Sequence, residues 1–136
     1  MKRSLVVILA IGAVLTARAF AALGQNEIAI ENLFGKPVRE GAPDKKGITT
    51  NVYQKGNYVI LVQFLNHLSL AESYARTDKK ELSQKEIDAF LEGSSNGRPW
   101  LKDPKKQQTW ERADLKASAW CQTTSSGLPT LLIEAR

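Results

Sequence analysis

An apolar stretch at residues 58–65, with turn residues on both sides, constrains the fold of this chain more than any other feature. Its sequence is YVILVQFL, so that Gln63 is the only polar side chain on either face of an extended strand. Such a strand is normally covered on both faces or lies in the middle of a sheet. Lys55-Gly56-Asn57 before it and Asn66-His67 after it are turn chemistry at hairpin spacing. Residues 52–76 are therefore predicted to form two β-hairpins that share one central strand.

The first 21 residues have the pattern of an export signal. A short basic start, MKRS, precedes an apolar run over residues 5–15 that is interrupted only by Gly12. Small residues at Ala19 and Ala21 predict cleavage after Ala21, and Ala17 and Ala19 offer a second site after Ala19. An uncleaved membrane anchor is the alternative, but the run falls short of the ~20 apolar residues that span a bilayer. We expect an exported protein, periplasmic or secreted, that does not span a membrane once the signal is removed.

Charge and cysteine content narrow the classes of function. Loss of Lys2, Arg3 and Arg18 with the signal would lower the formal net charge from +5 to +2. That charge is small for a nucleic-acid-binding domain, and interleaved aromatic residues are missing as well, so a nucleic-acid partner is not expected. Cys121 is the only cysteine, so no intramolecular disulfide can form. Residues 22–136 suit a single domain with a modest core.

The order of expected elements indicates an α+β domain. A short helix at Glu27–Phe34 should end at Gly35 and Pro37, and a loop should follow at residues 40–47. Three strands are expected at residues 48–54, 58–65 and 68–76, and the third reads as an outer strand with one wet face. Three more are expected at 109–113, 116–122 and 129–134. The prediction is a largely antiparallel sheet of about six strands in two meanders.

The second expected helix has a clear beginning. Ser83 and Glu86 have the spacing of a capping box, in which the serine hydroxyl accepts the Glu86 amide and the Glu86 side chain reaches back. Ile87, Phe90 and Leu91 fall on one apolar face, and Gly93 should end the helix. We expect this helix to pack across one face of the sheet.

Part of the chain resembles known small bacterial proteins. The resemblance rests on Gly35 and Pro37 after a short helix, on Val52-Tyr53 in a strand, and on Phe64 and Asn66 at the end of the apolar strand. This arrangement is similar to the small outer-membrane lipoprotein A family and to the fold of β-lactamase-inhibitor proteins. The whole mature chain is more similar to small uncharacterised secreted bacterial proteins. The resemblance implies a fold more than a function. The chain lacks a lipidated cysteine, and His67 follows Asn66 where a glycine is usual.

Residues that could carry catalysis are few and scattered. His67 is the only histidine, Cys121 has no partner for a metal site, and Ser125-Ser126-Gly127 lacks the setting of a nucleophile elbow. We expect His67 to be an exposed turn residue and Cys121 a small buried one, with a reactive thiol or an intermolecular disulfide as the minor alternative. Glu72 and Glu111 could meet across a sheet as glycosidase pairs do, although pairing with Arg76 or Arg112 is the simpler expectation. No catalytic, cofactor or metal site is predicted.

Two sets of residues are candidates for binding. Trp100 follows Arg98-Pro99 in a polar loop, and tryptophan and arginine are over-represented in interface hot spots. The alternative is that Trp100 folds back over the second helix. Trp110 and Trp120 lie on expected strands, where a core or sheet-covering role is favoured. The basic residues Lys102, Lys105 and Lys106, like Lys45-Lys46 and Lys79-Lys80, fall in expected loops, where solvated lysines are common.

These observations favour a non-enzymatic exported domain that binds a protein or a cell-envelope component. The leading hypothesis is a protein-binding module that uses an open face of the sheet. The alternative is a surface module that binds anionic glycan or lipid through the loop residues Lys102, Lys105 and Lys106, and a small hydrolase ranks behind both. Salt should separate the first two, because affinity that depends on scattered lysines falls with ionic strength.

Overall fold

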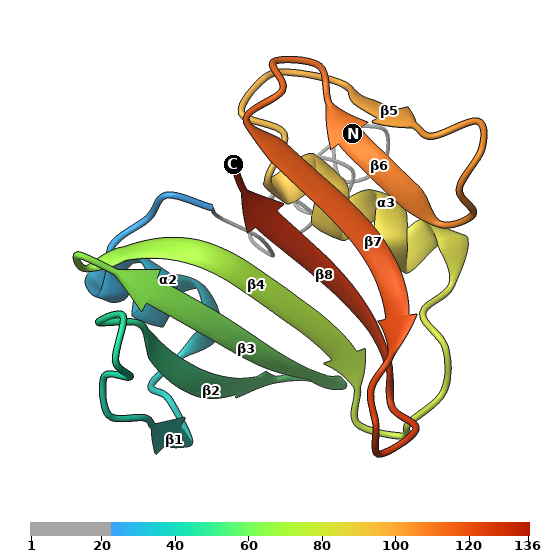
Figure 1. The fold of residues 1–136 in the computed structure, drawn as a ribbon. Coiled ribbons are helices and arrows are strands. Elements are labelled where there is room, and N and C mark those ends of the chain that lie inside the picture. The colour runs from blue at the N-terminus through green and yellow to red at the C-terminus, as the bar shows by residue number, and fades with distance from the viewer. Residues whose placement is uncertain (1–22) are drawn as a thin grey trace, which may run out of the picture.

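The computed structural model describes residues 23–136, which form an α+β fold of two helices and one antiparallel sheet of eight strands (Figure 1). The helices are α2 (Glu27–Phe34) and α3 (Gln84–Gly93). The strands are β1 (Arg39–Glu40), β2 (Thr49–Lys55), β3 (Tyr58–Leu65), β4 (Leu68–Arg76), β5 (Trp100–Lys102), β6 (Thr109–Arg112), β7 (Ala117–Thr123) and β8 (Pro129–Ala135). The predicted α+β class and antiparallel sheet are confirmed.

The sheet is built from two similar halves that meet at its centre. The strand order is β1-β2-β3-β4-β8-β7-β6-β5, so β4 and β8 pair in the middle and β1 and β5 lie at the edges. Each half consists of a helix followed by four strands along the chain. The sequence predicted six of these strands. It missed β1 and β5, because edge strands of two and three residues are too short to show a hydrophobic period.

Both helices pack on the same face of the sheet, and the core lies between. Phe34 of α2 contacts Tyr53 with ring centroids 5.9 Å apart, and Phe90 of α3 stacks on Tyr74 at 4.2 Å. The predicted stripe on α3 is buried. Every residue of the core cluster is 5% exposed or less: Ile30, Phe34, Tyr53, Ile60, Val62, Phe64, Tyr74, Ile87, Phe90, Leu91, Trp110, Ala119, Leu131 and Ile133. The two helices therefore do not cover the opposite face of the sheet.

The prediction that residues 68–76 form an outer strand with one wet face is wrong. β4 lies between β3 and β8, and Tyr74 and Glu72 are both fully buried on the helix side. The Tyr74 hydroxyl donates a hydrogen bond of 2.6 Å to the Glu72 carboxylate. Because the carboxylate has this buried partner, an acidic residue occupies a core position that its charge would assign to solvent.

The beginning of α3 confirms the predicted capping box. The Glu86 amide donates to the Ser83 hydroxyl at 3.1 Å, and the Ser83 amide donates to the Glu86 carboxylate at 2.9 Å. The same carboxylate also accepts hydrogen bonds from the Tyr58 hydroxyl of β3 and from Arg76 of β4. One side chain therefore caps the helix and ties its first turn to two central strands.

The hairpin turn between β3 and β4 also confirms its prediction. Asn66 and His67 both have positive φ, 52° and 65°, as a two-residue turn between antiparallel strands requires. Asparagine tolerates that conformation well, and Nδ1 of the exposed His67 lies 3.2 Å from the carboxylate of Glu27 of α2.

The predicted export signal at residues 1–21 lies outside the described residues. Among residues 23–136, no helix is long and apolar enough to cross a membrane.

Candidate binding surface

The face of the sheet that points away from both helices is called here the open face. Strand register places one row of side chains across it: Trp120 pairs with Leu132, Leu132 with Ser73, Ser73 with Leu61, and Leu61 with Val52. Neighbouring strands lie about 4.8 Å apart, so this row extends over roughly 20 Å. Four of its five members are large apolar residues, and all five keep some exposure to solvent.

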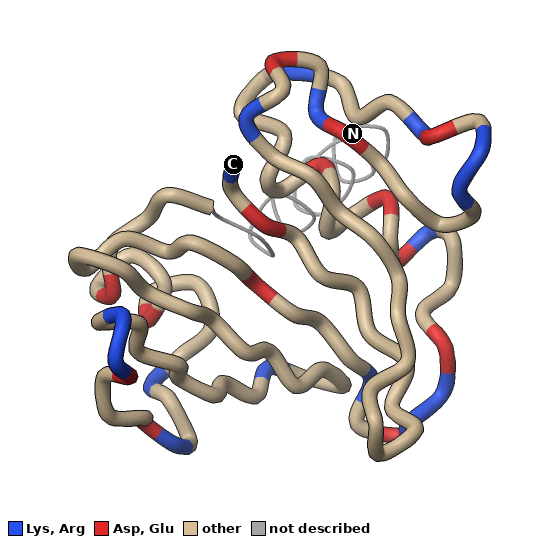
Figure 2. The backbone as a smooth tube through the Cα atoms, in the orientation of Figure 1, with Lys and Arg blue, Asp and Glu red and all other residues tan. Residues whose placement is uncertain are grey.

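No helix of residues 23–136 covers the open face. Leu61 on β3 is 38% exposed, and Val59, two residues away on the same face of that strand, is half-buried. The polar residues that flank the row on β3 and β7, Gln63 and Gln122, are uncharged. Charged residues gather mostly in the loops and at strand ends, and the middle of the sheet carries few (Figure 2). A partner could therefore bury this surface without stripping water from many charges.

Trp120 is the largest side chain on the open face. It is half-buried, and its indole N–H donates a 3.2 Å hydrogen bond to the Gln122 side chain two residues along β7. Its polar atom is thus satisfied within the protein, and the ring remains available for contact. The sequence predicts the same role for Trp110 as for Trp120, but Trp110 lies on the opposite face of the sheet, in the core, and is 5% exposed.

The structure places Trp100 against the protein interior. Trp100 begins β5 and packs partly buried on the core, and its indole N–H donates to the Leu91 carbonyl at the end of α3, at 2.7 Å. This is the geometry of the alternative in which Trp100 folds back over the helix. Arg98 is exposed in the preceding turn. A partner contact through Trp100 and Arg98 stays a prediction.

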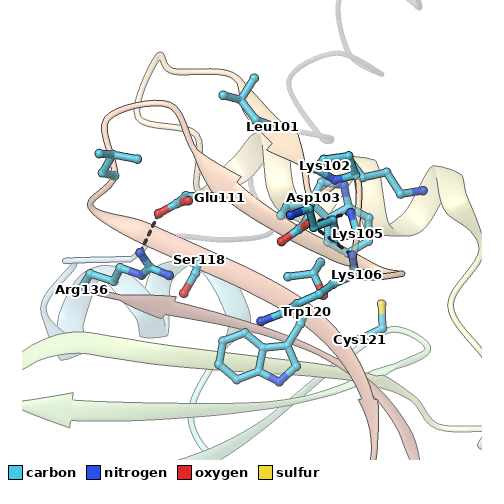
Figure 3. Close-up of a pocket in the computed structure, with 14 residues that line it drawn as sticks. Leu101, Lys102, Asp103, Lys105, Lys106, Glu111, Ser118, Trp120, Cys121 and Arg136 are labelled. Carbon is cyan, nitrogen blue, oxygen red and sulfur yellow. Dashed lines mark hydrogen bonds and ion pairs between the residues drawn. The ribbon is translucent and has the colours of Figure 1, made fainter.

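The structure brings the three candidate lysines to one hollow. Lys102 ends β5, and Lys105 and Lys106 follow in the loop to β6, at the rim of a hollow of about 760 Å³ (Figure 3). Asp103 organises this loop, because its carboxylate accepts the Lys105 amide at 2.8 Å and the Lys106 amide at 3.2 Å. These hydrogen bonds hold the pKa of Asp103 below its ordinary value.

The other side of the hollow is formed by residues of β6, of β7 and of the C-terminus. Arg136 donates to the Glu111 carboxylate at 2.6 Å, and Trp120 projects from β7 below this pair (Figure 3). Lys102 reaches over the ring of Trp110 at 5.9 Å from its centroid. Sequence reasoning found the lysines and missed Arg136 and Trp120, because only strand pairing brings β5, β7 and the C-terminus together.

The other lysine pairs lie elsewhere. Lys45 and Lys46 are exposed in the loop before β2, and Lys79 and Lys80 are exposed between β4 and α3. Since β2 and β5 belong to opposite halves of the sheet, Lys45 and Lys46 lie apart from the lysines of the hollow.

The hypothesis that Glu72 and Glu111 meet is wrong. Glu111 pairs in register with Ser118, Ser118 with Glu134 and Glu134 with Ala71, so Glu111 shares the open face with Ala71. Glu72, the next residue along β4, points to the helix side. The simpler expectation of pairing with Arg76 or Arg112 is also not met: the described ion pairs of these arginines go to Asp78, Glu86 and Asp114, and that of Glu111 to Arg136.

His67 lies where the sequence predicts it, whereas Cys121 is less buried than expected. His67 is an exposed turn residue. Cys121 is half-buried against the core, and burial raises the pKa of its thiol, which keeps the thiolate scarce at neutral pH. No group of three or more potential ligands among residues 23–136 could hold a metal ion.

Comparison with known proteins gives no family for this chain. It matches no protein-family model, and no curated protein is significantly similar in sequence. A cysteine-rich secretory protein from Staphylococcus aureus is similar in structure, with TM-score 0.48, 15% identity, and coverage of 84% of this chain and 44% of that one. An extracellular protein with an SCP domain from Bacillus anthracis gives TM-score 0.48, 11% identity, and coverage of 83% and 44%.

A third similar structure is closer in length. A DUF4309 family protein from Bacillus subtilis gives TM-score 0.45, 10% identity, and coverage of 82% of this chain and 79% of that one. This chain spans less than half the length of the first two structures. Likenesses at these TM-scores carry no functional argument.

Proposed function

We propose that this chain is an exported, non-enzymatic domain that binds a protein partner on its open sheet face. The observation that supports the proposal is the row Val52, Leu61, Ser73, Leu132 and Trp120, which runs across five strands on the side of the sheet opposite both helices. Contiguous apolar patches rimmed by polar residues mark interaction sites on soluble proteins.

The folding energetics of the sheet favour a role for this row outside the core. The helix side alone buries the aromatic and aliphatic cluster that stabilises the domain. Leu61 and Val52 contribute less to that stability, since both remain partly in water. The apolar surface that these side chains still expose to water contributes hydrophobic free energy only when a partner covers it.

The experiment that tests this function compares two charge insertions at exposed apolar positions. Leu61→Glu places a carboxylate in the row on β3, whereas Ile28→Glu places one on the outer side of α2, where Ile28 is 72% exposed. Each tagged protein is used to capture partners from the native envelope fraction, and captured proteins are identified by mass spectrometry. We expect a partner that wild type and Ile28→Glu retain and that Leu61→Glu loses.

The salt dependence and the stability of the variants complete the test. Binding through an uncharged apolar row should persist at high salt. Both variants should unfold at the wild-type urea concentration, because neither side chain is buried. A partner that all three proteins capture equally would place the contact elsewhere, and loss of capture in high salt would favour the lysines.

One observation favours a second binding role. Lys102, Lys105 and Lys106 lie together at one hollow, as the anionic glycan or lipid hypothesis requires. A hydrolase has no comparable support, since the hollow lacks a histidine, and its two carboxylates, Asp103 and Glu111, are engaged with backbone amides and with Arg136.

A further inference from the structure

We propose that the β5 edge of the sheet is a second binding site, which adjoins the proposed protein-binding row at Trp120, and that it docks on an anionic lipid surface. The docking edge consists of Lys102, Lys105 and Lys106 with the exposed leucines Leu101 and Leu115, all of which line the same hollow. An anionic lipid surface attracts cationic side chains to its headgroups and apolar side chains to the layer beneath them.

The lysines of the docking edge carry charges that no described ion pair neutralises, although the Lys102 amine also lies over the Trp110 ring. No carboxylate of residues 23–136 lies within ion-pair distance of Lys102, Lys105 or Lys106. The nearby acids are already engaged, since Asp103 accepts two backbone amides and Glu111 pairs with Arg136. The four cations at the hollow therefore exceed its two carboxylates.

The two leucines are the second, independent observation. Leu101 is 57% exposed on the edge strand β5, and Leu115 is 64% exposed in the turn between β6 and β7. Both leucines thus keep large apolar side chains in water at the same hollow. Leu115 also has φ of 62°, a left-handed conformation that favours glycine or asparagine and that leucine rarely adopts. The turn thus keeps a large apolar side chain in water at a position where its backbone is unfavourable.

The arrangement fits a lipid surface better than a polyanion alone. A nucleic acid would require several stacking aromatics, and an acidic glycan would make no use of Leu101 and Leu115. A membrane interface uses both kinds of side chain, because the leucines enter the acyl boundary while the lysine amines stay among the phosphates. Each lysine near an anionic surface contributes roughly fivefold in affinity, so three contribute about 100-fold.

The test uses processed protein, with its N-terminus verified, and vesicles of defined composition. Co-sedimentation is measured with phosphatidylcholine alone and with equal parts of phosphatidylcholine and phosphatidylglycerol, at low and high salt. We expect binding to the anionic vesicles only, and loss of binding at high salt. Because no protein partner is present, failure here leaves the proposed protein-binding function untouched.

Two sets of variants separate the contributions. The triple variant Lys102→Gln, Lys105→Gln, Lys106→Gln should lower affinity about 100-fold, whereas a matched loss of three charges in the other half, Lys36→Gln, Lys45→Gln, Lys46→Gln, should have a much smaller effect.

Leu101→Ser with Leu115→Asn should weaken binding at least tenfold, and Ile28→Ser serves as its control. Asparagine suits the left-handed turn, so this variant should remain folded.

Three outcomes would overturn the proposal. One is equal binding to neutral and anionic vesicles, and another is no binding to anionic vesicles at low salt. The third is loss of binding in the lysine variant but not in the leucine variant, together with displacement from the vesicles by soluble polygalacturonate. That result would assign the lysines to an acidic glycan.

Discussion

Glu86 offers the sharpest test of how this fold is held together. Its carboxylate accepts hydrogen bonds from the Ser83 amide at 2.9 Å, from Arg76 at 3.1 Å and from the Tyr58 hydroxyl. Glu86→Ala removes all three and leaves the half-buried Tyr58 hydroxyl without this acceptor. A hydrogen bond contributes about 0.5–1.5 kcal/mol, and more where a charge takes part. The variant should lose about 2–3 kcal/mol of a total of roughly 5–15 kcal/mol.

The assay is urea unfolding followed by circular dichroism, with Glu92→Ala as control. Glu92 is exposed on the same helix, so its replacement makes the same chemical change without loss of a described contact. We expect the control to stay within about 0.5 kcal/mol of wild type. Equal midpoints for Glu86→Ala and Glu92→Ala would refute the argument that this carboxylate anchors α3 to the sheet.

The pH dependence provides an independent check on Glu86. Partial burial alone would raise its pKa, but the hydrogen bonds from Ser83, Tyr58 and Arg76 outweigh burial, and the pKa is lowered in the folded protein. A lowered folded pKa means that the unfolded chain takes up the proton first as pH falls. The stability difference between wild type and Glu86→Gln should therefore be complete above the unfolded pKa of about 4.3 and shrink at lower pH. A difference that stays constant to acidic pH would contradict this account.

Three further predictions follow from the signal, the core and the cysteine. Mass spectrometry of exported protein should find an N-terminus at Ala22, or else at Phe20, and an intact Met1 in a membrane pellet would refute export. Ile60→Ala should lower the free energy of unfolding by about 2–5 kcal/mol, because Ile60 is fully buried. Lys105→Ala is the control and should leave the urea midpoint unchanged. Equal midpoints for Ile60→Ala and wild type would place Ile60 outside the core. Alkylation of Cys121 should have its pH midpoint above that of the unfolded thiol, since burial raises its pKa, and a midpoint at or below the unfolded value would indicate an activated cysteine.

Local sequence determined the elements whose signals lie within a few residues. The capping box of Ser83 and Glu86, the turn at Asn66-His67 and the helix at Glu27–Phe34 are read correctly, because each depends on contacts between near neighbours in the chain. The apolar strand at residues 58–65 is also placed correctly, since its composition allows only a position inside a sheet.

Strand pairing decided what the sequence left open. The alternation of residues 68–76 resembles a half-wet strand, yet β4 became central once β8 paired with its free edge. Glu72 can lie in the core because the buried hydroxyl of Tyr74, two residues along the same strand, donates a hydrogen bond to its carboxylate. The ring of Tyr74 in turn stacks on Phe90 of α3. Local sequence does not show either result. β4 and β8 lie far apart in the chain, and the burial of Glu72 depends on which face of the sheet the helices cover.

The candidate binding surfaces also depend partly on local sequence and partly on tertiary structure. Residue types alone marked Lys102, Lys105 and Lys106 as cationic and Trp100 as a possible contact. Tertiary structure turned Trp100 inward onto α3 and placed Trp120 outward on the open face. The physical reason is that a side chain's exposure depends on which face of a strand it occupies and on what covers that face. Sequence determined the strands of this protein and their apolar content, and only the packing of both helices on one side decided which residues remain available to a partner.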